Sequence, residues 1–373
     1  MDRKLRIGVV FGGRSGEHEV SLVSATSVIN ALDKEKYDVV PIGITQEGRW
    51  LSSAQGLKLL KEKTGIKQAP ECFLVPEPNR QALVDAGNGA MHSAPLDVIF
   101  PIVHGTYGED GTLQGLLELA NIPYVGAGVL ASAVGMDKIV QKQLFQQQKL
   151  PVAKYIWFYS SVCRDHPDRV AKAVARDLKY PVFVKPANTG SSVGISKAHD
   201  KKELLEALKM AIDYDRKVII EQGINDIREV ECSVLGNDEP IASVPGEIVP
   251  SNEFYDYNAK YVDGKSEAII PAKLPKRVIE DIRRIALQAY QALDIAGMSR
   301  VDFLVAKKTN KIYLNEVNTI PGFTSISMYP KLWEASGIGY AELLDRLIQL
   351  ALERHRDKNA RKTVYRPERD WYK

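Results

Sequence analysis

The sequence predicts an α/β protein that opens with a parallel sheet, and three observations support this fold class. Residues 5–11 form an apolar run that ends in two glycines and leads into a helical stretch. Residues 37–44 form a second apolar run, and strand, helix and strand in succession are typical of a parallel sheet. Residues 152–223 then alternate strands with helices, and residues 299–318 indicate two strands around a polar turn. The later part of the chain is therefore expected to mix α and β structure.

Composition excludes several classes of function. The chain has 373 residues, enough for two or three domains, and its 45% hydrophobic and 26% charged content is typical of a soluble globular protein. Lys and Arg number 50 against 47 Asp and Glu, so no excess of positive charge indicates nucleic acid as the main partner. The segment GGRSGEHE after the first strand lacks the second glycine of G-x-G-x-x-G, which argues against a nicotinamide site.

The cysteines and the apolar runs indicate a cytoplasmic protein. Cys72, Cys163 and Cys232 are far apart and have no metal-binding spacing, so free thiols in a reducing compartment are expected. The apolar run near the start is too short for a signal peptide, and no run is long enough to span a membrane.

The loop that follows the strand predicted at residues 96–103 is a candidate ligand-binding loop. It reads HGTYGEDGT and combines three glycines with His104, a glutamate and an aspartate. Ligands of open α/β sheets bind beyond the carboxyl ends of the strands, although a flexible connector is the alternative. A helix is expected from residue 129 towards 148, carrying Met136-Asp137-Lys138, with a domain boundary near Gly135.

A cation and a loop of small residues come together in the stretch YPVFVKPANTGSSVGIS. Lys185 lies in the apolar strand, and Ser191, Ser192 and four further small residues follow it. Such a loop lets backbone N–H groups converge on an anion, and polyphosphate suits it best. A plain Gly/Ser turn is the alternative, but a strand lysine between apolar neighbours is costly unless it meets a negative charge.

Three further features accompany this cradle. Glu221, followed by Gln222, ends an apolar strand and is predicted either to accept hydrogen bonds from an amino group or to cap the strand edge. Glu229 and Glu231 face the same way on the next strand by the period of two. Residues 246–275 form a long connection with four aromatic residues, which favours a lid over disorder.

The strongest physical signal is the hairpin in SRVDFLVAKKTNKIYLNEVNTIPG. With the turn centred on Thr309, Asp302 lies opposite Glu316 and Arg300 lies opposite Asn318. Three hard oxygen ligands and one cation then share a patch of sheet, and Mg²⁺ prefers such oxygens completed by substrate phosphates. A polar face held by an Arg–carboxylate pair is the alternative.

These features together resemble the ATP-grasp fold, through Lys185 with its loop, Glu221, Asp302 and Glu316-Val317-Asn318. Within that fold, six segments are similar to the D-alanine–D-alanine ligase family: GGRSGEHEVSL, HGTYGEDGTLQG, KPANTGSSVGISK, EFYDYNAKY, SRVDF and NEVNTIPGFTSISMYP. The resemblance extends from about residue 4 to 352 and leaves a basic, solvated tail. It implies a fold that is α/β overall and α+β in its ATP-grasp part.

The resemblance also implies roles for particular residues in nucleotide and metal binding. Lys138 and Lys185 would neutralise ATP phosphates under Ser192 and the loop amides, and Glu221 with Gln222 would hold the adenine and Glu229 the ribose. Asp302, Glu316 and Asn318 would bind two Mg²⁺ ions, which Mn²⁺ could replace, and a monovalent cation such as K⁺ is a further candidate cofactor.

For the amino-acid substrates, Glu17 would hold the ammonium of the first D-alanine near His104, and Arg300 would stabilise the tetrahedral oxyanion. Gly322, Ser327 and Met328 would receive the second D-alanine. Lys260 and Tyr261 would close from the lid, with Tyr261 reaching Ser191 and Glu17.

The implied activity is ATP-dependent formation of D-alanyl-D-alanine through D-alanyl phosphate, for peptidoglycan synthesis and cell shape, by a cytoplasmic homodimer without nucleic-acid or membrane partners. The expected domains are residues 1–134, 135–228 and 229–373, the last with the lid at 246–275. The nearest alternative is a ligase that uses D-lactate or D-serine as second substrate. Another carboxylate–amine ligase or a carboxylase of the same fold is a more distant alternative, because the tyrosine-bearing lid and the context of Glu17 argue against it. A silent nucleotide-binding module is disfavoured because Arg300, Asp302, Glu316 and Asn318 are all present.

Overall fold

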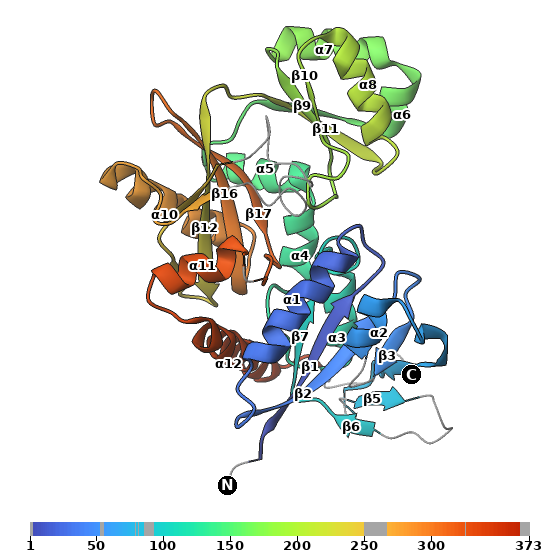
Figure 1. Cartoon of the computed structure of the whole chain (residues 1–373). Coiled ribbons are helices and arrows are strands. Elements are labelled where there is room, and N and C mark those ends of the chain that lie inside the picture. Colours follow the sequence, from blue (N-terminus) through green and yellow to red (C-terminus); the bar gives the residue numbers. More distant parts are fainter. Residues whose placement is uncertain are drawn as a thin grey trace.

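The computed structural model describes residues 3–52, 56–78, 80, 82–85, 93–249, 267–324 and 326–365. Figure 1 shows the chain passing from an N-terminal part (blue), through a central part (green), to a C-terminal part (yellow to red). No helix in the described residues is long and apolar enough to cross a membrane.

The N-terminal part contains the predicted parallel sheet. Its strand order is β3-β2-β1-β7, in which β1 pairs in parallel with β2 and β7, while β3 adds an antiparallel edge. The elements are β1 (Leu5–Gly12), α1 (His18–Ala31), β2 (Tyr37–Ile44), β3 (Trp50–Ser52), α2 (Gly56–Glu62), a 3₁₀ turn (Ile66–Gln68), β7 (Val98–Ile102) and α3 (Thr112–Leu119). A small antiparallel sheet lies beside them, made of β4 (Cys72–Leu74), β5 (Ala82–Asp85) and β6 (Ser93–Pro95).

The helix expected from residue 129 to 148 is two helices, α4 (Val129–Met136) and α5 (Lys138–Gln147). Asp137 lies between them with an extended backbone, and its carboxylate accepts hydrogen bonds from the N–H groups of Ile139 and Val140. Asp137 thereby satisfies two amides that the first turn of α5 leaves without a partner. The break sets Lys138 at the start of α5.

The central part is an antiparallel sheet covered by helices, in the predicted order of strands and helices. The strand order is β10-β9-β11-β8. In Figure 1, α6, α7 and α8 lie together beside this sheet. The elements are β8 (Tyr155–Tyr159), α6 (Ser160–Asp165), α7 (Pro167–Asp177), β9 (Val182–Pro186), β10 (Ser196–Ala198), α8 (Lys201–Ala211) and β11 (Lys217–Gln222).

The C-terminal part is built on an antiparallel sheet of order β15-β14-β12-β16-β17, with β13 beside β12. The predicted loop at 246–275 is shorter than expected, because its ends form paired strands β14 and β15, and residues 250–266 lie outside the described residues. The elements are β12 (Ile227–Gly236), β13 (Ile241–Ala242), β14 (Gly246–Val249), β15 (Glu267–Ile269), α10 (Lys276–Ala292), β16 (Gly297–Ala306), β17 (Ile312–Asn318), α11 (Met328–Ala335) and α12 (Tyr340–Asn359).

The predicted register of the β16–β17 hairpin is confirmed. Arg300 pairs with Asn318 and Asp302 with Glu316. A bulge follows, since the next paired positions are Phe303 and Leu314. The bulge at Asn315 keeps Leu314 in the same buried core as Phe303 and Val317, while Glu316 and Asn318 line the cavities.

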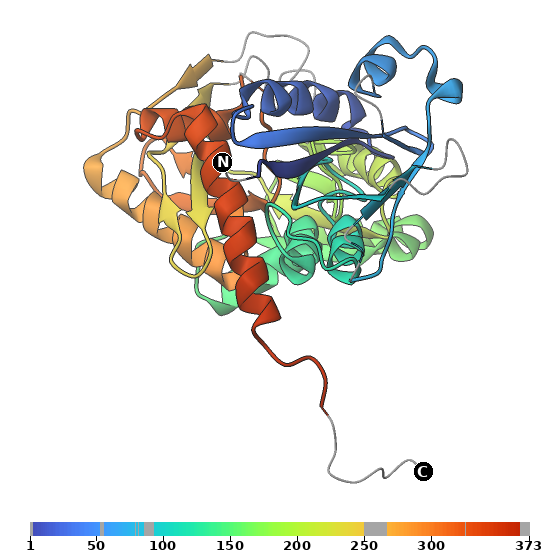
Figure 2. The ribbon, with the colours of Figure 1, turned by 90° about the horizontal axis from the view of Figure 1, so that it is seen from below.

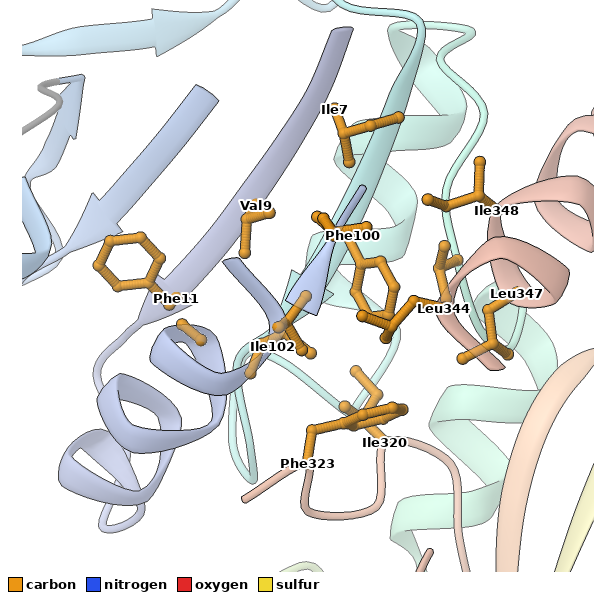
Figure 3. Close-up of a cluster of buried hydrophobic side chains, with 14 of the residues drawn as sticks. Ile7, Val9, Phe11, Phe100, Ile102, Ile320, Phe323, Leu344, Leu347 and Ile348 are labelled. Atoms are coloured by element: carbon orange, nitrogen blue, oxygen red, sulfur yellow. The ribbon is translucent and has the colours of Figure 1, made fainter. Parts of the chain in front are cut away.

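One hydrophobic core joins the two ends of the chain. Figure 3 shows Ile7 and Phe100 of the N-terminal sheet on the side facing Leu344, Leu347 and Ile348 of α12, with Ile102 and Phe323 below them. The rings of Phe100 and Phe323 meet edge to face at 5.8 Å between centroids. Figure 2 shows α12 as a long helix running alongside the N-terminal sheet. The loop after β17 is therefore fixed against the end of β7.

Candidate active site

Two cavities meet between the central sheet, the β16–β17 hairpin and the loops of the N-terminal sheet. Ser192, Glu231 and Glu316 line both of them. Every predicted site residue in the described part of the chain lines one cavity or both. The first holds Glu17, His104, Lys138, Ser191, Arg300, Asn318, Gly322, Ser327 and Met328, and the second holds Lys185, Glu221, Gln222, Glu229 and Asp302. Lys260 and Tyr261 lie outside the described residues.

The Gly/Ser loop between β9 and β10 is anchored where it leaves β9. Asp215 accepts hydrogen bonds from the backbone N–H and the side-chain amide of Asn188, at 2.7 and 2.9 Å. Lys138 Nζ donates to the Thr189 carbonyl at 2.7 Å. Ser191 and Ser192 adopt left-handed backbone conformations, with φ of 46° and 59°, which non-glycine residues seldom do. The loop therefore borders the first cavity, which Ser191, Ser192 and Lys138 all line.

Glu221 is held between two lysines beneath the second cavity. Lys185 Nζ lies 2.7 Å from Glu221 Oε2, and Lys142 Nζ lies 3.0 Å from Oε1. Burial alone would raise the pKa of Glu221, but the two ammonium groups lower it to about 2. Burial works against the charge of Lys185 too, yet Glu221 and Glu316 raise the pKa of Lys185, whereas burial prevails at Lys142 and lowers its pKa.

The hairpin face carries the predicted hard-oxygen donors, now seen with their contacts. Arg300 donates to both oxygens of Asp302 at 2.7 Å, and the side-chain amide of Asn318 donates to Asp302 Oδ2 at 2.9 Å. Arg300 Nε also lies 3.1 Å from Glu231 Oε2, and Lys138 Nζ lies 3.5 Å from Glu316 Oε2. The Arg–carboxylate pair that the sequence left as an alternative is thus present.

This donor set still fits a divalent cation of the Mg²⁺ type. No group of three or more His, Cys, Asp or Glu side chains in the described residues is arranged to hold a metal ion. The predicted set instead combines two carboxylates, Asp302 and Glu316, with one amide oxygen from Asn318. Mg²⁺ is commonly bound by one or two carboxylates with substrate phosphates and water completing its shell. The side chain of Glu316 is 22% exposed and lines both cavities.

Glu17 lies at the start of α1, where the N-terminal sheet meets the Gly/Ser loop. The Ser191 hydroxyl donates to its carboxylate. Gly105 and Gly190 flank that carboxylate so closely that a Cβ on Gly105 would come within 2.6 Å of Oε2, and one on Gly190 would collide with it. A side chain at either position would therefore displace the Glu17 carboxylate, and Gly105 also has the left-handed φ of 73° that favours glycine. Glu17 is buried at the wall of the first cavity.

His104 supports the site through protein contacts. Its Nδ1 lies 3.1 Å from the Ile320 carbonyl and its Nε2 lies 3.1 Å from Ser24 Oγ. A carbonyl only accepts, so Nδ1 carries the proton and Nε2 accepts from the Ser24 hydroxyl. Burial lowers the pKa of His104, which favours this neutral form. His104 thus ties the loop after β7 to the loop after β17.

Glu109, which sequence reasoning left without a role, makes a second tie between the same two loops. Its carboxylate accepts from the N–H groups of Gly105 at 2.7 Å and Ile320 at 2.9 Å. Although the residue as a whole is only partly buried, enclosure of the carboxyl group and the charge of Glu17 raise the pKa of Glu109 to about 8. Its place among three glycines after a strand was the signal for a binding loop.

Two residues of α5 were also missed. Gln141 pairs with the backbone of Val317, where its Oε1 accepts from the N–H at 3.0 Å and its Nε2 donates to the carbonyl at 3.3 Å. Lys142 Nζ donates to the Asn315 carbonyl at 2.8 Å. Both side chains are buried, and both hold the strand that carries Glu316 and Asn318. Lys142 stands four residues after Lys138, which places it on a neighbouring part of the same helix face and was the available signal.

The far wall of the first cavity is the turn before α11. Ser327 Oγ contacts Thr324 Oγ1 at 2.8 Å and accepts from the Thr324 N–H at 3.1 Å. A Cβ on Gly322 would lie 2.7 Å from Ser327 Oγ. Ser327 and the buried Met328 thus form a compact surface at the start of α11.

Known proteins share both the sequence and the fold. Profiles described as D-ala D-ala ligase N-terminus and C-terminus match residues 6–127 and 144–349. The D-alanine–D-alanine ligase of Caldicellulosiruptor bescii is 52% identical over 357 residues, which cover 96% of this chain and 98% of the relative.

Solved structures agree with these matches. The D-alanine–D-alanine ligase from Coxiella burnetii superposes with a TM-score of 0.84 at 38% identity and covers 96% of this chain and 97% of its own. The VanG D-Ala:D-Ser ligase from Enterococcus faecalis reaches a TM-score of 0.83 at 37% identity, over 94% of this chain and 100% of its own.

Proposed function

This chain belongs to the D-alanine–D-alanine ligase family, and from that premise we propose which of its residues carry out the family's reaction. It is an ATP-dependent ligase that joins two D-alanines into D-alanyl-D-alanine, a peptidoglycan precursor, with ADP and phosphate as the other products. One observation supports the assignment of residues: two joined cavities collect every predicted site residue in the described part of the chain.

In this proposal the second cavity receives ATP. Glu221 and Gln222 take the adenine, Glu229 takes the ribose, and Lys185, Lys138 and the Gly/Ser loop take the phosphates. Asp302, Glu316 and Asn318 hold Mg²⁺, which would neutralise the charge that develops on the transferred phosphoryl group. The ATP requirement follows from the family, whereas the Mg²⁺ ligands are our assignment.

The first cavity receives the two D-alanines. Glu17 binds the ammonium of the first, whose carboxylate attacks the γ-phosphorus of ATP and becomes an acyl phosphate as ADP leaves. The amine of the second D-alanine, bound near Gly322, Ser327 and Met328, then attacks the acyl carbon after losing a proton. The C–O bond to phosphate breaks, and Arg300 stabilises the oxyanion that forms in between.

Phosphate release with each amino acid tests the function. The purified protein with ATP, Mg²⁺ and D-alanine should release phosphate and yield a product of dipeptide mass, whereas L-alanine should give neither. With D-alanine and D-lactate at equal concentration near pH 7, the dipeptide should predominate. Predominant D-alanyl-D-lactate, or a D-alanyl-D-serine product in preference to the dipeptide when D-serine is supplied, would overturn the assignment of the second substrate.

The metal assignment has its own test in Glu316→Gln. Because this change removes a carboxylate from the hairpin face and keeps the side-chain shape, turnover should fall at least about 100-fold while the melting temperature and ATP binding stay close to wild type. Glu334→Gln, on the exposed side of α11, is the matched control. Full activity of Glu316→Gln at ordinary Mg²⁺ would remove Glu316 from the ligand set.

Three further statements remain proposals. A cytoplasmic location is supported by the use of ATP and by three buried free thiols. A homodimer and the domain limits 1–134, 135–228 and 229–373 follow from the family resemblance. Light scattering of the purified protein tests the homodimer, and limited proteolysis tests the domain limits.

A further inference from the structure

The two lysines that contact Glu221 differ in what else they can reach. Lys185 lines the second cavity beside the Gly/Ser loop. Lys142 lines neither cavity, and its side chain is only 2% exposed. Each approaches a different oxygen of the carboxylate, so neither blocks the other. A ligand in the cavity can therefore meet Lys185 but not Lys142.

Lys142 is fixed in place, and its position does not depend on a ligand. It lies inside α5, and its Nζ donates to the Asn315 carbonyl of β17 at 2.8 Å besides contacting Glu221 at 3.0 Å. Lys185 lies near the end of β9, and within the described residues its Nζ hydrogen-bonds to Glu221 alone, at 2.7 Å. A move of Lys185 toward the cavity would thus break a single ion pair, whereas a move of Lys142 would also strip a strand carbonyl of its donor.

The three side chains carry one more positive than negative charge. A buried carboxylate left without a cation is costly, and removing one partner of a buried pair is strongly destabilising. With both lysines present, one of them suffices to compensate Glu221, and the other is available to an incoming anion. Of the two lysines, Lys185 is the one that an incoming anion can reach, because it lines the second cavity and Lys142 does not.

We propose that Lys142 is the permanent counter-ion of Glu221, and that Lys185 exchanges Glu221 for a phosphate when ATP binds. Lys142 is then a positioning residue: it touches no substrate, keeps Glu221 compensated for its contact with adenine, and frees Lys185 for the phosphates. This inference rests on the proposed ATP-binding role of the second cavity. It assigns different work to two lysines that contact the same carboxylate.

The test is a double-mutant cycle between Lys142 and Glu221. In otherwise wild-type protein, Lys142→Met makes Lys185 the sole counter-ion, so the KM for ATP should rise at least about tenfold, or about 1.4 kcal/mol. The KM for D-alanine should stay within about threefold. In a Glu221→Gln background no carboxylate needs a cation, so adding Lys142→Met should change the KM for ATP less than about threefold.

Support of β17 alone would give a different pattern. If Lys142 acts only through the Asn315 carbonyl, its loss costs the same in both backgrounds, and that additive result would overturn the proposal. Lys142→Gln keeps a donor for Asn315 without the charge and should behave like Lys142→Met, and it carries the cycle if the Met variant does not fold. Lys154→Met, on the exposed surface, is the matched control.

Direct binding supplies a second readout by calorimetry. Adenosine has no phosphate and does not draw Lys185 from Glu221, so Lys142→Met should weaken ATP binding and leave adenosine binding unchanged. Equal weakening of both ligands would overturn the proposal. Wild-type protein that forms no dipeptide would instead refute the proposed function, so the two failures are distinguishable.

Discussion

At the scale of single residues, the carboxylate of Glu17 is closely surrounded by its neighbours at the wall of the first cavity. Glu17 is enclosed by Gly105, Gly190 and the Ser191 hydroxyl. A buried carboxylate in such a position is stabilised by hydrogen bonds and by a cation. In our proposal, the ammonium of the first D-alanine supplies that cation in the cavity that Glu17 lines.

We predict that Glu17→Gln raises the KM for the first D-alanine by about 10- to 100-fold, since a hydrogen bond to a charged group contributes about 1.5–3 kcal/mol. Steady-state kinetics at saturating ATP measure this change. Glu19→Gln, exposed on the same helix, should be indistinguishable from wild type. An unchanged KM in Glu17→Gln would show that the ammonium binds elsewhere.

The raised pKa of Glu109 makes the stability of the folded protein decrease as pH rises. Its pKa is raised from 4.5 to about 8, so between these values the folded protein holds a proton that the unfolded chain has released. The contribution of Glu109 to stability is therefore present below about pH 4.5 and is lost as pH rises through about 8.

Urea unfolding of wild type and Glu109→Gln between pH 5 and 9 tests this sign. With rising pH the wild type should lose unfolding free energy relative to the Gln variant, by at most about 1.4 kcal/mol per pH unit. A constant difference across the series would contradict the prediction.

At the scale of elements, α5 acts as the brace of strand β17. The side-chain amide of Gln141 hydrogen-bonds to both the N–H and the carbonyl of Val317, as the backbone of a neighbouring strand would. Glu316 and Asn318 flank that residue and face the cavities. The position of two proposed metal ligands thus depends on a helix from another part of the chain.

Gln141→Ala should leave a buried N–H of Val317 without its partner and cost about 1–3 kcal/mol of unfolding free energy, with a fall in kcat. Thermal unfolding and kinetics measure the two effects. Gln143→Ala on the exposed face of the same helix is the control and should change neither. A stable, fully active Gln141→Ala would show that β17 needs no brace.

The predictability of each element from sequence follows from the range of its interactions. The hairpin register was predictable because alternation and turn length are local, and Arg300–Asn318 and Asp302–Glu316 pair as expected. The roles of Gln141 and Lys142 were not, because their partners are backbone carbonyls and amides more distant in sequence than any motif. The α4–α5 break was missed because Asp137 as a cap looks like an ordinary helix residue.

At the scale of the whole molecule, the hydrophobic core that joins β1 and β7 to α12 sets the stability of the N-terminal sheet. Leu347 is fully buried in that core (Figure 3). Leu347→Ala should reduce the unfolding free energy by about 2–5 kcal/mol. Hydrogen exchange should show the loss of protection in β1 as well as in α12, whereas Glu353→Ala on the exposed side of the helix should not. Loss confined to α12 would mean that the sheet is stable without it.

The same shared core bears on how the protein is made. During synthesis the strands near residue 7 and residue 100 leave the ribosome long before the helix near residue 347 that covers them. Until that helix arrives, one apolar face of the nascent sheet stays open to water and to other chains. A recombinant fragment that stops near residue 127 should accordingly aggregate, although all the residues that match the N-terminal family profile lie within it. Engineers who wish to exchange the N-terminal part between relatives would therefore need to move α12 with it.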